Sequence, residues 1–391
     1  MDSNQLFSLL KRNAVDIFSP EGLRKRLSSG KPLTVKFGAD PSRPDLHLGH
    51  SVPLRMLRAL QDAGHSIVFV IGDFTGMVGD PSGKSRARAP LTFEETRRNA
   101  ESYLQQAAKI LDPRNARIVY NSQWLAKMDF HDVLSLAGKY TLARMMERDD
   151  FSSRYASRQP ISLHELLYPL MQGYDSVALG ADIEVGGTDQ TFNLLVGREL
   201  QRDYGQEPQE VITFPLLPGL DGVEKMSKSL DNYIGIDEAA EVMFEKCMKV
   251  PDQVLPLYFR LTTDIPDDDS AAAVKRNIRE AHFMYAREIV RMYHGAIAVQ
   301  HAEKRYLTVA AGGVPGNIRQ IHIAEKEIQL IDLLILSGFA SSKSEGRRLI
   351  EGKGIRLDGE TVEDIQAVVR KDTTLSRGKN RFVFVRFGLE G

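Results

Sequence analysis

The sequence predicts an α/β protein: a doubly wound parallel sheet, then an all-α domain and a small α+β module. Short β-rich runs alternate with helical patterns over residues 1–235, which is typical of a parallel sheet of the Rossmann type. From residue 236 the pattern is helical, without a strand pattern until about Gly354. The end of the chain then combines a turn with the alternating strand Arg381 to Phe387. A chain of 391 residues is too long for one typical core, so several domains are expected.

Composition describes an ordinary globular protein. The chain has 51 Lys+Arg and 52 Asp+Glu, so the overall charge does not indicate a nucleic-acid partner and any basic surface must be local. The single cysteine, Cys247, excludes an intramolecular disulfide and a four-cysteine zinc site, and we interpret it as a small core residue. No apolar stretch approaches ~18 residues and the N-terminus is unlike a signal peptide, so we expect a cytoplasmic location and no membrane contact.

The strongest local pattern is a strand that leads into a helix. A β-type run at residues 33–37 is followed by a sharp turn, and a helical pattern begins at about His50. Free backbone N–H groups and the positive end of the helix dipole favour an anion at such a junction. Gly49 has no side chain and lies between His47 and His50, so a flat ring can approach the backbone there. The pattern predicts a nucleotide site, although histidines also occur at helix ends without a function.

A second polar pattern lies far downstream, at Lys225-Met226-Ser227-Lys228-Ser229. It follows the apolar strand predicted at Val211 to Leu217, and taken alone it could be a solvated surface loop. His-Leu-Gly-His followed by Lys-Met-Ser-Lys-Ser resembles the two motifs of class I aminoacyl-tRNA synthetases. Their order and separation suit one nucleotide-binding domain, so we expect both segments to face one ATP.

The other elements of the first half follow from their local patterns. The run Ser66 to Ile71 is suited to a buried parallel strand. The glycine-rich turn at residues 72–84 is not a phosphate loop of the Walker type, because Val78 stands where that motif needs glycine. Thr92 and Glu95 form a capping box. The remaining predictions are short helices in residues 1–30, a helix from Thr92 to about Leu111, and a strand from Arg117 to Tyr120.

A helical insertion is expected at about residues 124–182. Within it, Tyr168, Gln172 and Asp175 recur on one helix face among leucines. A mixed solvent face is the alternative, but buried Gln and Asp need polar partners, which a bound ligand supplies. The turn Gly186 to Gln190 precedes a helix at Phe192 to Arg202, and its Asp189 is either a helix cap or a ligand contact.

The last third shows two basic patterns. Four arginines lie roughly opposite the apolar face of a helical segment, which is usually a solvated face but here also suggests phosphate contacts. After a linker, an apolar helix at Ile328 to Leu336, a helix capped at Ser342 and an Asp358-Gly359 hairpin are predicted. This module resembles the RNA-binding module named after a small-subunit ribosomal protein.

Together these patterns resemble the bacterial tyrosyl-tRNA synthetases over nearly the whole chain. The tryptophanyl relatives share the first motif but typically lack the Tyr-x3-Gln-x2-Asp pattern and the terminal module. The resemblance implies a catalytic domain at 1–235 with a connective insertion at about 124–182, a helical tRNA anticodon-region domain at 236–309, a linker at 310–325 and an RNA-binding module at 326–391.

The implied reaction joins L-tyrosine to ATP, with release of pyrophosphate, and then transfers the tyrosyl group to the 3′ end of tRNA(Tyr). The resemblance assigns catalysis to Ser42, His47, His50, Lys84, Lys225 and Lys228. It assigns tyrosine binding to Lys36, Asp80, Tyr168, Gln172, Asp175 and Gln190. It assigns ATP binding to Gly38, Asp40, His47, Gly49, His50, Gly187, Asp189, Lys225, Met226 and Lys228. tRNA contacts are expected at Arg276, Arg279, Arg287, Arg291, Arg347 and Arg348.

The resemblance also implies a homodimer, and Mg²⁺ that accompanies ATP without a metal site of protein ligands. Lys36 departs from the family, in which many members have a tyrosine that contacts the substrate hydroxyl. We expect Lys36 either to pair with Asp175 or to reach that hydroxyl. Pro53 is expected in the first turn of the motif helix, where it causes no kink. Two alternatives remain: an RNA-binding protein descended from a synthetase, and a smaller nucleotidyltransferase that shares the His-x-Gly-His motif.

Overall fold

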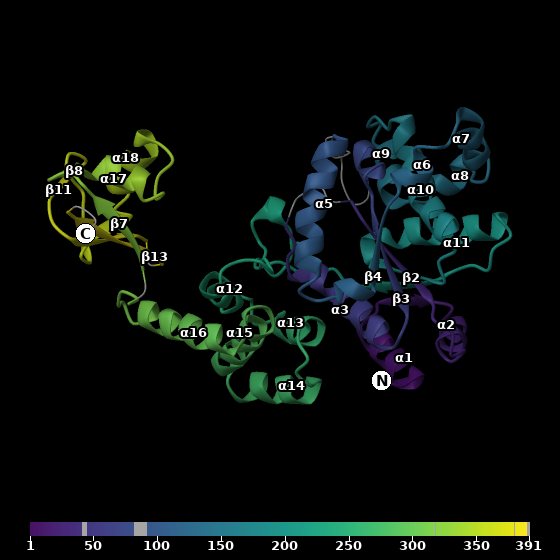
Figure 1. Cartoon of the computed structure of the whole chain (residues 1–391), viewed down its shortest axis with the longest axis horizontal. Coiled ribbons are helices and arrows are strands. Elements are labelled where there is room, and N and C mark those ends of the chain that lie inside the picture. Colours follow the sequence, from purple (N-terminus) through teal and green to yellow (C-terminus); the bar gives the residue numbers. More distant parts are fainter. Residues whose placement is uncertain (41–44, 82–91, 317, 379, 389–391) are drawn as a thin grey trace. The chain divides into compact units, whose positions relative to one another are not determined.

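The computed structural model describes residues 1–40, 45–81, 92–316, 318–378 and 380–388. The chain forms two compact units, Met1–Gly295 and Ala296–Gly391. Each unit has its own sheet (Figure 1). In the parts of the chain just given, no helix is both long and apolar enough to span a membrane.

The first unit is organised around a six-stranded sheet in the order β1-β6-β5-β2-β3-β4. All neighbouring pairs are parallel except β1 with β6. The order reverses between β2 and β5, so ligands are expected beyond the carboxyl ends of these two strands. The predicted α/β fold class is therefore confirmed. The strands are β1 (Asp16–Phe18), β2 (Thr34–Ala39), β3 (Ser66–Ile71), β4 (Ala116–Tyr120), β5 (Ile183–Gly187) and β6 (Glu210–Phe214).

Helices cover both faces of this sheet, with α5 on one side and α10 and α11 on the other (Figure 1). The predicted capping box begins α5: the Thr92 amide donates to Glu95 Oε2 (2.8 Å) and the Glu95 amide donates to Thr92 Oγ1 (3.1 Å). The motif helix α3 begins at Leu48, earlier than predicted, so Pro53 lies inside it and not in its first turn. The covering helices are α3 (Leu48–Asp62), α5 (Phe93–Ala107), α10 (Leu163–Leu179) and α11 (Thr191–Asp203).

The rest of the first unit is mostly helical. The segment expected to hold only short helices also contains β1, a three-residue edge strand. The helical segment with the arginines is broken at Asn277, whose side chain accepts from the amides of Arg279 and Glu280 and so starts a new helix. These helices are α1 (Ser3–Asn13), α2 (Pro20–Leu27), α4 (Thr75–Val78), α6 (Ser122–Leu125), α7 (Phe130–Ala137), α8 (Leu142–Met145), α9 (Asp149–Ala156), α12 (Ala240–Cys247), α13 (Leu255–Thr262), α14 (Asp267–Arg276) and α15 (Ile278–His294).

The second unit begins with α16 (Ala296–Ala310) and contains a five-stranded sheet in the order β10-β9-β12-β13-β7. Strands β7 and β8 precede Gly354, so the prediction of no earlier strand was wrong, and β7 lies inside the segment 310–325 predicted as a linker. Its remaining elements are β7 (Arg319–Ile323), β8 (Ile328–Gln329), α17 (Leu330–Leu336), α18 (Lys343–Glu351), β9 (Ile355–Leu357), β10 (Glu360–Thr361), β11 (Val368–Val369), β12 (Thr373–Arg377) and β13 (Arg381–Phe387).

Candidate active site

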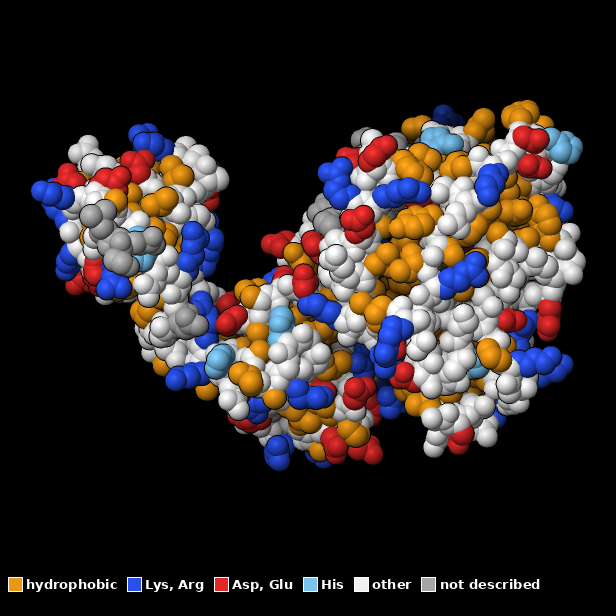
Figure 2. Space-filling model, viewed as in Figure 1, with side chains coloured by type: hydrophobic (Ala, Val, Ile, Leu, Met, Phe, Trp, Pro, Cys, Tyr) orange, Lys and Arg blue, Asp and Glu red, His pale blue; other side chains and the backbone are white. Residues whose placement is uncertain are grey.

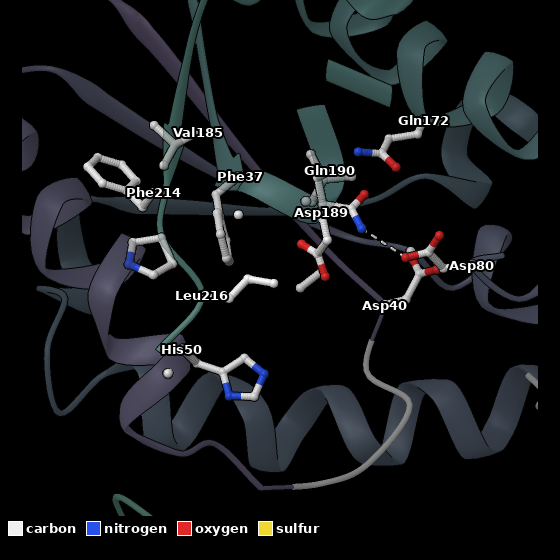
Figure 3. Close-up of a pocket in the computed structure, with 18 of the residues that line it drawn as sticks. Phe37, Asp40, His50, Asp80, Gln172, Val185, Asp189, Gln190, Phe214 and Leu216 are labelled. Atoms are coloured by element: carbon white, nitrogen blue, oxygen red, sulfur yellow. Dashed lines mark hydrogen bonds between the residues drawn. The ribbon is translucent and has the colours of Figure 1, made fainter. Parts of the chain in front are cut away.

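A cavity of about 580 Å³ opens at the carboxyl ends of β2 and β5, where the strand order reverses. Its walls include both motif segments, with His47 and His50 from the first and Lys225 and Lys228 from the second. Figure 3 shows polar side chains from several elements around this space. Its size and its mixed polar and apolar lining suit a small-molecule site.

Backbone hydrogen bonds join the two motif segments. The Leu48 amide donates to the Ile234 carbonyl (2.9 Å), and the Ile236 amide donates to the Leu46 carbonyl (3.2 Å). His47 and Gly235 form a β-bridge between these bonds. The segment after the lysine motif is therefore paired directly with the start of α3, which brings the lysines and the histidines to one cavity.

The two histidines lie against each other at the start of α3. Their ring centroids are 3.9 Å apart, and a Cβ at Gly49 would come within 3.0 Å of the His47 ring. Burial and the nearby His50 and Lys225 lower the pKa of His47 to about 2. His47 is therefore a neutral imidazole at physiological pH. Its Nδ1 is buried and has no hydrogen-bond partner among the described residues.

The lysine motif is held by an asparagine that follows it. Asn232 accepts from the Ser227 amide (2.8 Å) and donates to the Lys225 carbonyl (3.3 Å). Lys225 Nζ lies 2.9 Å from Asp189 Oδ2, and Lys228 forms an ion pair with Asp45. The two lysines therefore reach acidic groups at the edge of the cavity.

A cluster of polar side chains lies at another part of the cavity. Tyr168 donates its hydroxyl to Asp40 Oδ2 (2.7 Å), and Thr75 donates to Asp40 Oδ1 (2.8 Å). Gln190 Nε2 donates to Asp80 Oδ2 (3.0 Å), as Figure 3 shows. Burial, and then the nearby Asp40 and Asp80, raise the pKa of Tyr168, so its hydroxyl stays protonated.

Gly72 is required beside this cluster. A Cβ there would lie 1.8 Å from Asp40 Oδ1 and 2.3 Å from Thr75 Oγ1. Any side chain at this position would displace the Asp40 carboxylate. The first glycine after β3 therefore makes room for the polar cluster.

Asn193 connects the two predicted glutamines and was missed in the sequence. Its Nδ2 donates to Gln172 Oε1 and to Gln190 Oε1, each at 3.0 Å. Its Oδ1 accepts from Arg148 (3.3 Å), which is paired with Asp150. Because arginine can only donate, it sets the orientation of the Asn193 amide, and Asn193 in turn sets that of both glutamines.

Asp175 forms a buried acidic part of the cavity wall. Its Oδ1 accepts from Trp124 Nε1 (2.8 Å) and its Oδ2 accepts from Asn121 Nδ2 (3.4 Å). Burial raises the pKa of Asp175 to about 7, while Lys36 and these two hydrogen bonds oppose the rise. A buried carboxylate with two side-chain donors is suited to accept a further hydrogen bond from a ligand hydroxyl.

Lys36 does not line the cavity, which corrects the prediction that it contacts tyrosine directly. It is fully buried, and its Nζ lies 2.8 Å from the Gln172 carbonyl, from Ser176 Oγ and from Glu184 Oε1. It donates two hydrogen bonds, to Gln172 and Ser176, and forms an ion pair with Glu184. Its ammonium group is therefore held by these three residues, away from the cavity.

Some predicted residues lie elsewhere. Ser42 and Lys84 lie outside the described residues. Arg276 is the last residue of α14, not of the helix that carries the other three arginines of its group, and Arg291 is paired with Glu288 at 2.7 Å. The four arginines of the helical segment and the two of α18 are all exposed. The predicted residues that line the cavity are Gly38, Asp40, His47, Gly49, His50, Asp80, Tyr168, Gln172, Asp175, Gly187, Asp189, Gln190, Lys225, Met226 and Lys228.

Four residues of the site were not predicted from the sequence, and only one of them has a local spacing that could have indicated it. Asn193 follows Gln190 by three positions at the start of a helix, so it shares a face with that residue. Trp124, Asn121 and Arg148 lie far from their partners in the chain, and no local spacing connects them with the site.

Comparison with known proteins adds independent information. The family described as "tRNA synthetases class I (W and Y)" matches residues 28–309, and a domain described as "Tyrosine--tRNA ligase SYY-like C-terminal domain" matches residues 310–389. A tyrosine–tRNA ligase of Deinococcus radiodurans is 50% identical, with 99% of this chain and 97% of that protein covered. One from Thermotoga maritima is 46% identical, with 99% of each chain covered.

A solved structure has a similar fold. The crystal structure of a tyrosyl-tRNA synthetase from Archaeoglobus fulgidus, complexed with L-tyrosine, superimposes with a TM-score of 0.63 at 25% identity. The match covers 78% of this chain and 99% of that one.

Proposed function

Because the chain belongs to the class I tRNA synthetases of the tryptophan and tyrosine type, we propose that it is a tyrosine–tRNA ligase. It activates L-tyrosine with ATP to tyrosyl-adenylate and pyrophosphate, and then transfers the tyrosyl group to the 3′ end of tRNA(Tyr). One observation above all supports this proposal. A single cavity combines the histidine and lysine motif segments with the buried Asp175 carboxylate.

Tyrosine is recognised at both of its ends. Asp175 accepts the phenol hydroxyl, which phenylalanine and tryptophan lack, and a buried carboxylate without its donor is costly. Asp80, Gln172 and Tyr168 receive the ammonium group, because a carboxylate and two neutral acceptors match its three donors. Gln190, whose amide also donates to Asp80, steers the substrate carboxylate toward the α-phosphorus.

The enzyme lowers the activation barrier of adenylate formation by positioning the two substrates and stabilising the charge on the phosphates. No covalent enzyme intermediate is formed. The tyrosine carboxylate attacks the α-phosphorus of ATP, and pyrophosphate leaves. Neutral His47 donates an N–H to the γ-phosphate, together with Ser42. His50 lies near the ribose, and Asp189 accepts from the ribose hydroxyls. Gly38, Gly49 and Gly187 leave space for the nucleotide, while Asp40 and Met226 complete its surroundings.

Three lysines, Lys84, Lys225 and Lys228, neutralise the departing pyrophosphate. In this structure, Lys225 forms an ion pair with Asp189. When ATP binds, Lys225 leaves this carboxylate and pairs with phosphate oxygens. Such an exchange requires the loop to move during activation.

Mg²⁺ accompanies ATP in this proposal. The described residues contain no cluster of three or more His, Cys, Asp or Glu side chains that could hold a metal ion. In proteins, Mg²⁺ usually binds through substrate phosphates and the waters that it keeps, so we infer that the triphosphate oxygens and water supply most of its ligands.

The proposed tRNA contacts are made by exposed arginines. The proposed location of the protein is the cytoplasm. Arg276, Arg279, Arg287 and Arg291 lie on α14 and α15, and Arg347 and Arg348 lie on α18. Their exposure supports phosphate contacts. The proposed domains are a catalytic domain at 1–235, a helical tRNA anticodon-region domain at 236–309 and an RNA-binding module at 326–391.

A homodimer is proposed through the insertion. Large apolar side chains that are more than half exposed gather in its helices, and Figure 2 shows hydrophobic side chains over this part of the first unit. Such a surface is typical of a protein interface. The residues are Phe130, Leu134, Leu142, Tyr155 and Leu163.

Pyrophosphate exchange tests the function directly. With ATP and labelled pyrophosphate, tyrosine drives exchange, whereas tryptophan and phenylalanine do not. Exchange with none of the amino acids would refute the activity and favour an RNA-binding protein that has lost catalysis.

A further inference from the structure

A buried ion pair lies at the wall of the cavity: Glu184 lines the cavity, Lys36 does not, and neither is among the groups assigned above to ATP. The side chains of Lys36 and Glu184 are 0% and 1% exposed, and Lys36 Nζ lies 2.8 Å from Glu184 Oε1. Burying two charges costs about as much free energy as their attraction returns. Stability alone therefore gives little reason for a lysine at this position.

The pair is held against the turn of α10 that carries Asp175. Lys36 Nζ donates to the carbonyl of Gln172 and to the hydroxyl of Ser176, both at 2.8 Å. These two residues flank Asp175 along the helix. Ser176 Oγ in turn donates to Glu184 Oε2 (3.0 Å). The ammonium group is thus fixed close to Asp175 without touching its carboxylate.

The positive end of the pair has the larger effect on Asp175. Burial raises the pKa of Asp175, Lys36 is the strongest of the groups that lower it, and Glu184 raises it by less. On the same helix, Tyr168 interacts electrostatically with Asp175, and Tyr174 directly precedes it. Asp40 and Asp80 line the same cavity as further acidic groups.

We propose that Lys36 is a positioning residue for tyrosine selectivity: its buried ammonium, held by Glu184, keeps Asp175 as a carboxylate that accepts the phenol hydroxyl. The inference rests on the proposed function and deepens it. A protonated Asp175 has lost one acceptor oxygen and the charge that strengthens this hydrogen bond. Without Lys36, tyrosine therefore loses its advantage over phenylalanine near neutral pH.

The decisive variant is Lys36→Met combined with Glu184→Gln. Lys36→Met alone leaves Glu184 buried and unpaired, which is expected to destabilise the fold. The double variant removes both charges, so its melting temperature returns toward that of the unmutated chain. Its Tyr/Phe ratio of kcat/KM in pyrophosphate exchange is expected to fall ~fivefold at pH 7 and ~tenfold at pH 6, which corresponds to a rise of about one unit in the pKa of Asp175.

The pH profile separates a charge effect from a packing effect. In the double variant, the acid limb of kcat/KM for tyrosine moves to higher pH, and the Tyr/Phe ratio recovers by pH 9. A stable double variant with the unmutated ratio at every pH would overturn the proposal. A ratio that stays low at pH 9 would also overturn it, because the loss would then come from displaced side chains.

A second buried ion pair provides the matched control. Arg154 Nη1 lies 2.6 Å from Glu165 Oε2, and the two side chains are 7% and 4% exposed. Glu165 lies in the first turn of the same helix, α10. Arg154→Met combined with Glu165→Gln is expected to leave the Tyr/Phe ratio unchanged, and an equal fall would overturn the proposal. Absence of tyrosine-dependent exchange in the unmutated chain would refute the proposed function instead.

Discussion

At the residue scale, the protonation state of Asp175 is expected to make tyrosine binding depend on pH. Its pKa is raised to about 7, so without ligand the group passes from carboxylic acid to carboxylate as pH rises through neutrality. In the proposed function, tyrosine donates its hydroxyl to the carboxylate form. We therefore expect kcat/KM for tyrosine in pyrophosphate exchange to rise ~tenfold per pH unit below about pH 7 and to level off above it.

Asp175→Asn provides the comparison, because it keeps the shape of the side chain and cannot ionise. Its profile is expected to be flat through neutral pH, with a loss of tyrosine selectivity of about 1–3 kcal/mol. The KM for ATP changes little, since the substitution is at the phenol site. An unchanged Tyr/Phe ratio would contradict the role given to this residue.

Asn193 gives a second prediction at this scale. It donates to both glutamines while Arg148 donates to it, so Asn193→Asp keeps the bond to Arg148 but removes both donated protons. Gln172 and Gln190 must then turn their amides, which takes the Gln190 donor away from Asp80. We expect the KM for tyrosine to rise ~tenfold, as for the loss of one or two hydrogen bonds, with little change in the KM for ATP.

The control for this change is Asn193→Ala, which removes the donor without adding a charge. A smaller rise in the KM for tyrosine is expected there, because water can satisfy the glutamine oxygens. Equal KM values for tyrosine in Asn193→Asp and the unmutated chain would show that the amide orientation has no role in binding.

At the scale of elements, the lysine motif depends on a close contact behind it. A Cβ at Gly219 would lie 2.2 Å from Asn232 Nδ2 and 2.7 Å from the Asn232 carbonyl. Gly219→Ala therefore displaces the asparagine that holds Lys225 and Ser227. We expect the rate of adenylate formation in rapid-quench experiments to fall ~tenfold or more, with the KM for tyrosine retained.

Gly316→Ala serves as the control, because a Cβ there meets nothing within 4 Å. It is expected to leave the adenylate rate unchanged. If Gly219→Ala raised the KM for tyrosine and left the rate intact, the lysine motif would act in binding and not in the chemical step.

The elements also show which parts of the fold are encoded locally. β3 and β13 have the predicted bounds, because a continuous apolar run and a strict alternation are visible in the sequence. β1 and β7 were missed, because they are short or largely polar and exist through pairing with distant strands. The same holds in the site: His47 and Lys225 belong to recognisable motifs, whereas Trp124 contributes only through a contact 51 positions along the chain.

At the scale of the whole molecule, the two units divide the proposed function. The second unit has its own core, which includes Leu330, Ile350, Leu375 and Val385. Among the described residues, those that line the cavity all belong to the first unit. Under the proposed function, adenylate formation is therefore expected to require only the first unit. tRNA charging is expected to require also the exposed arginines of the second unit.

Truncation after Val309 tests this division. The shortened chain is expected to retain tyrosine-dependent pyrophosphate exchange within about twofold, because the residues that line the cavity all lie before Gly295 and compact units can fold alone. Aminoacylation of tRNA(Tyr) is expected to fall below detection, since the phosphate contacts of the terminal module are lost. A companion truncation after Gly295 ends at the boundary of the compact unit and is expected to behave alike. Loss of exchange in both shortened chains would mean that the terminal part supports the catalytic fold, whereas retained charging would place tRNA recognition entirely within the first unit.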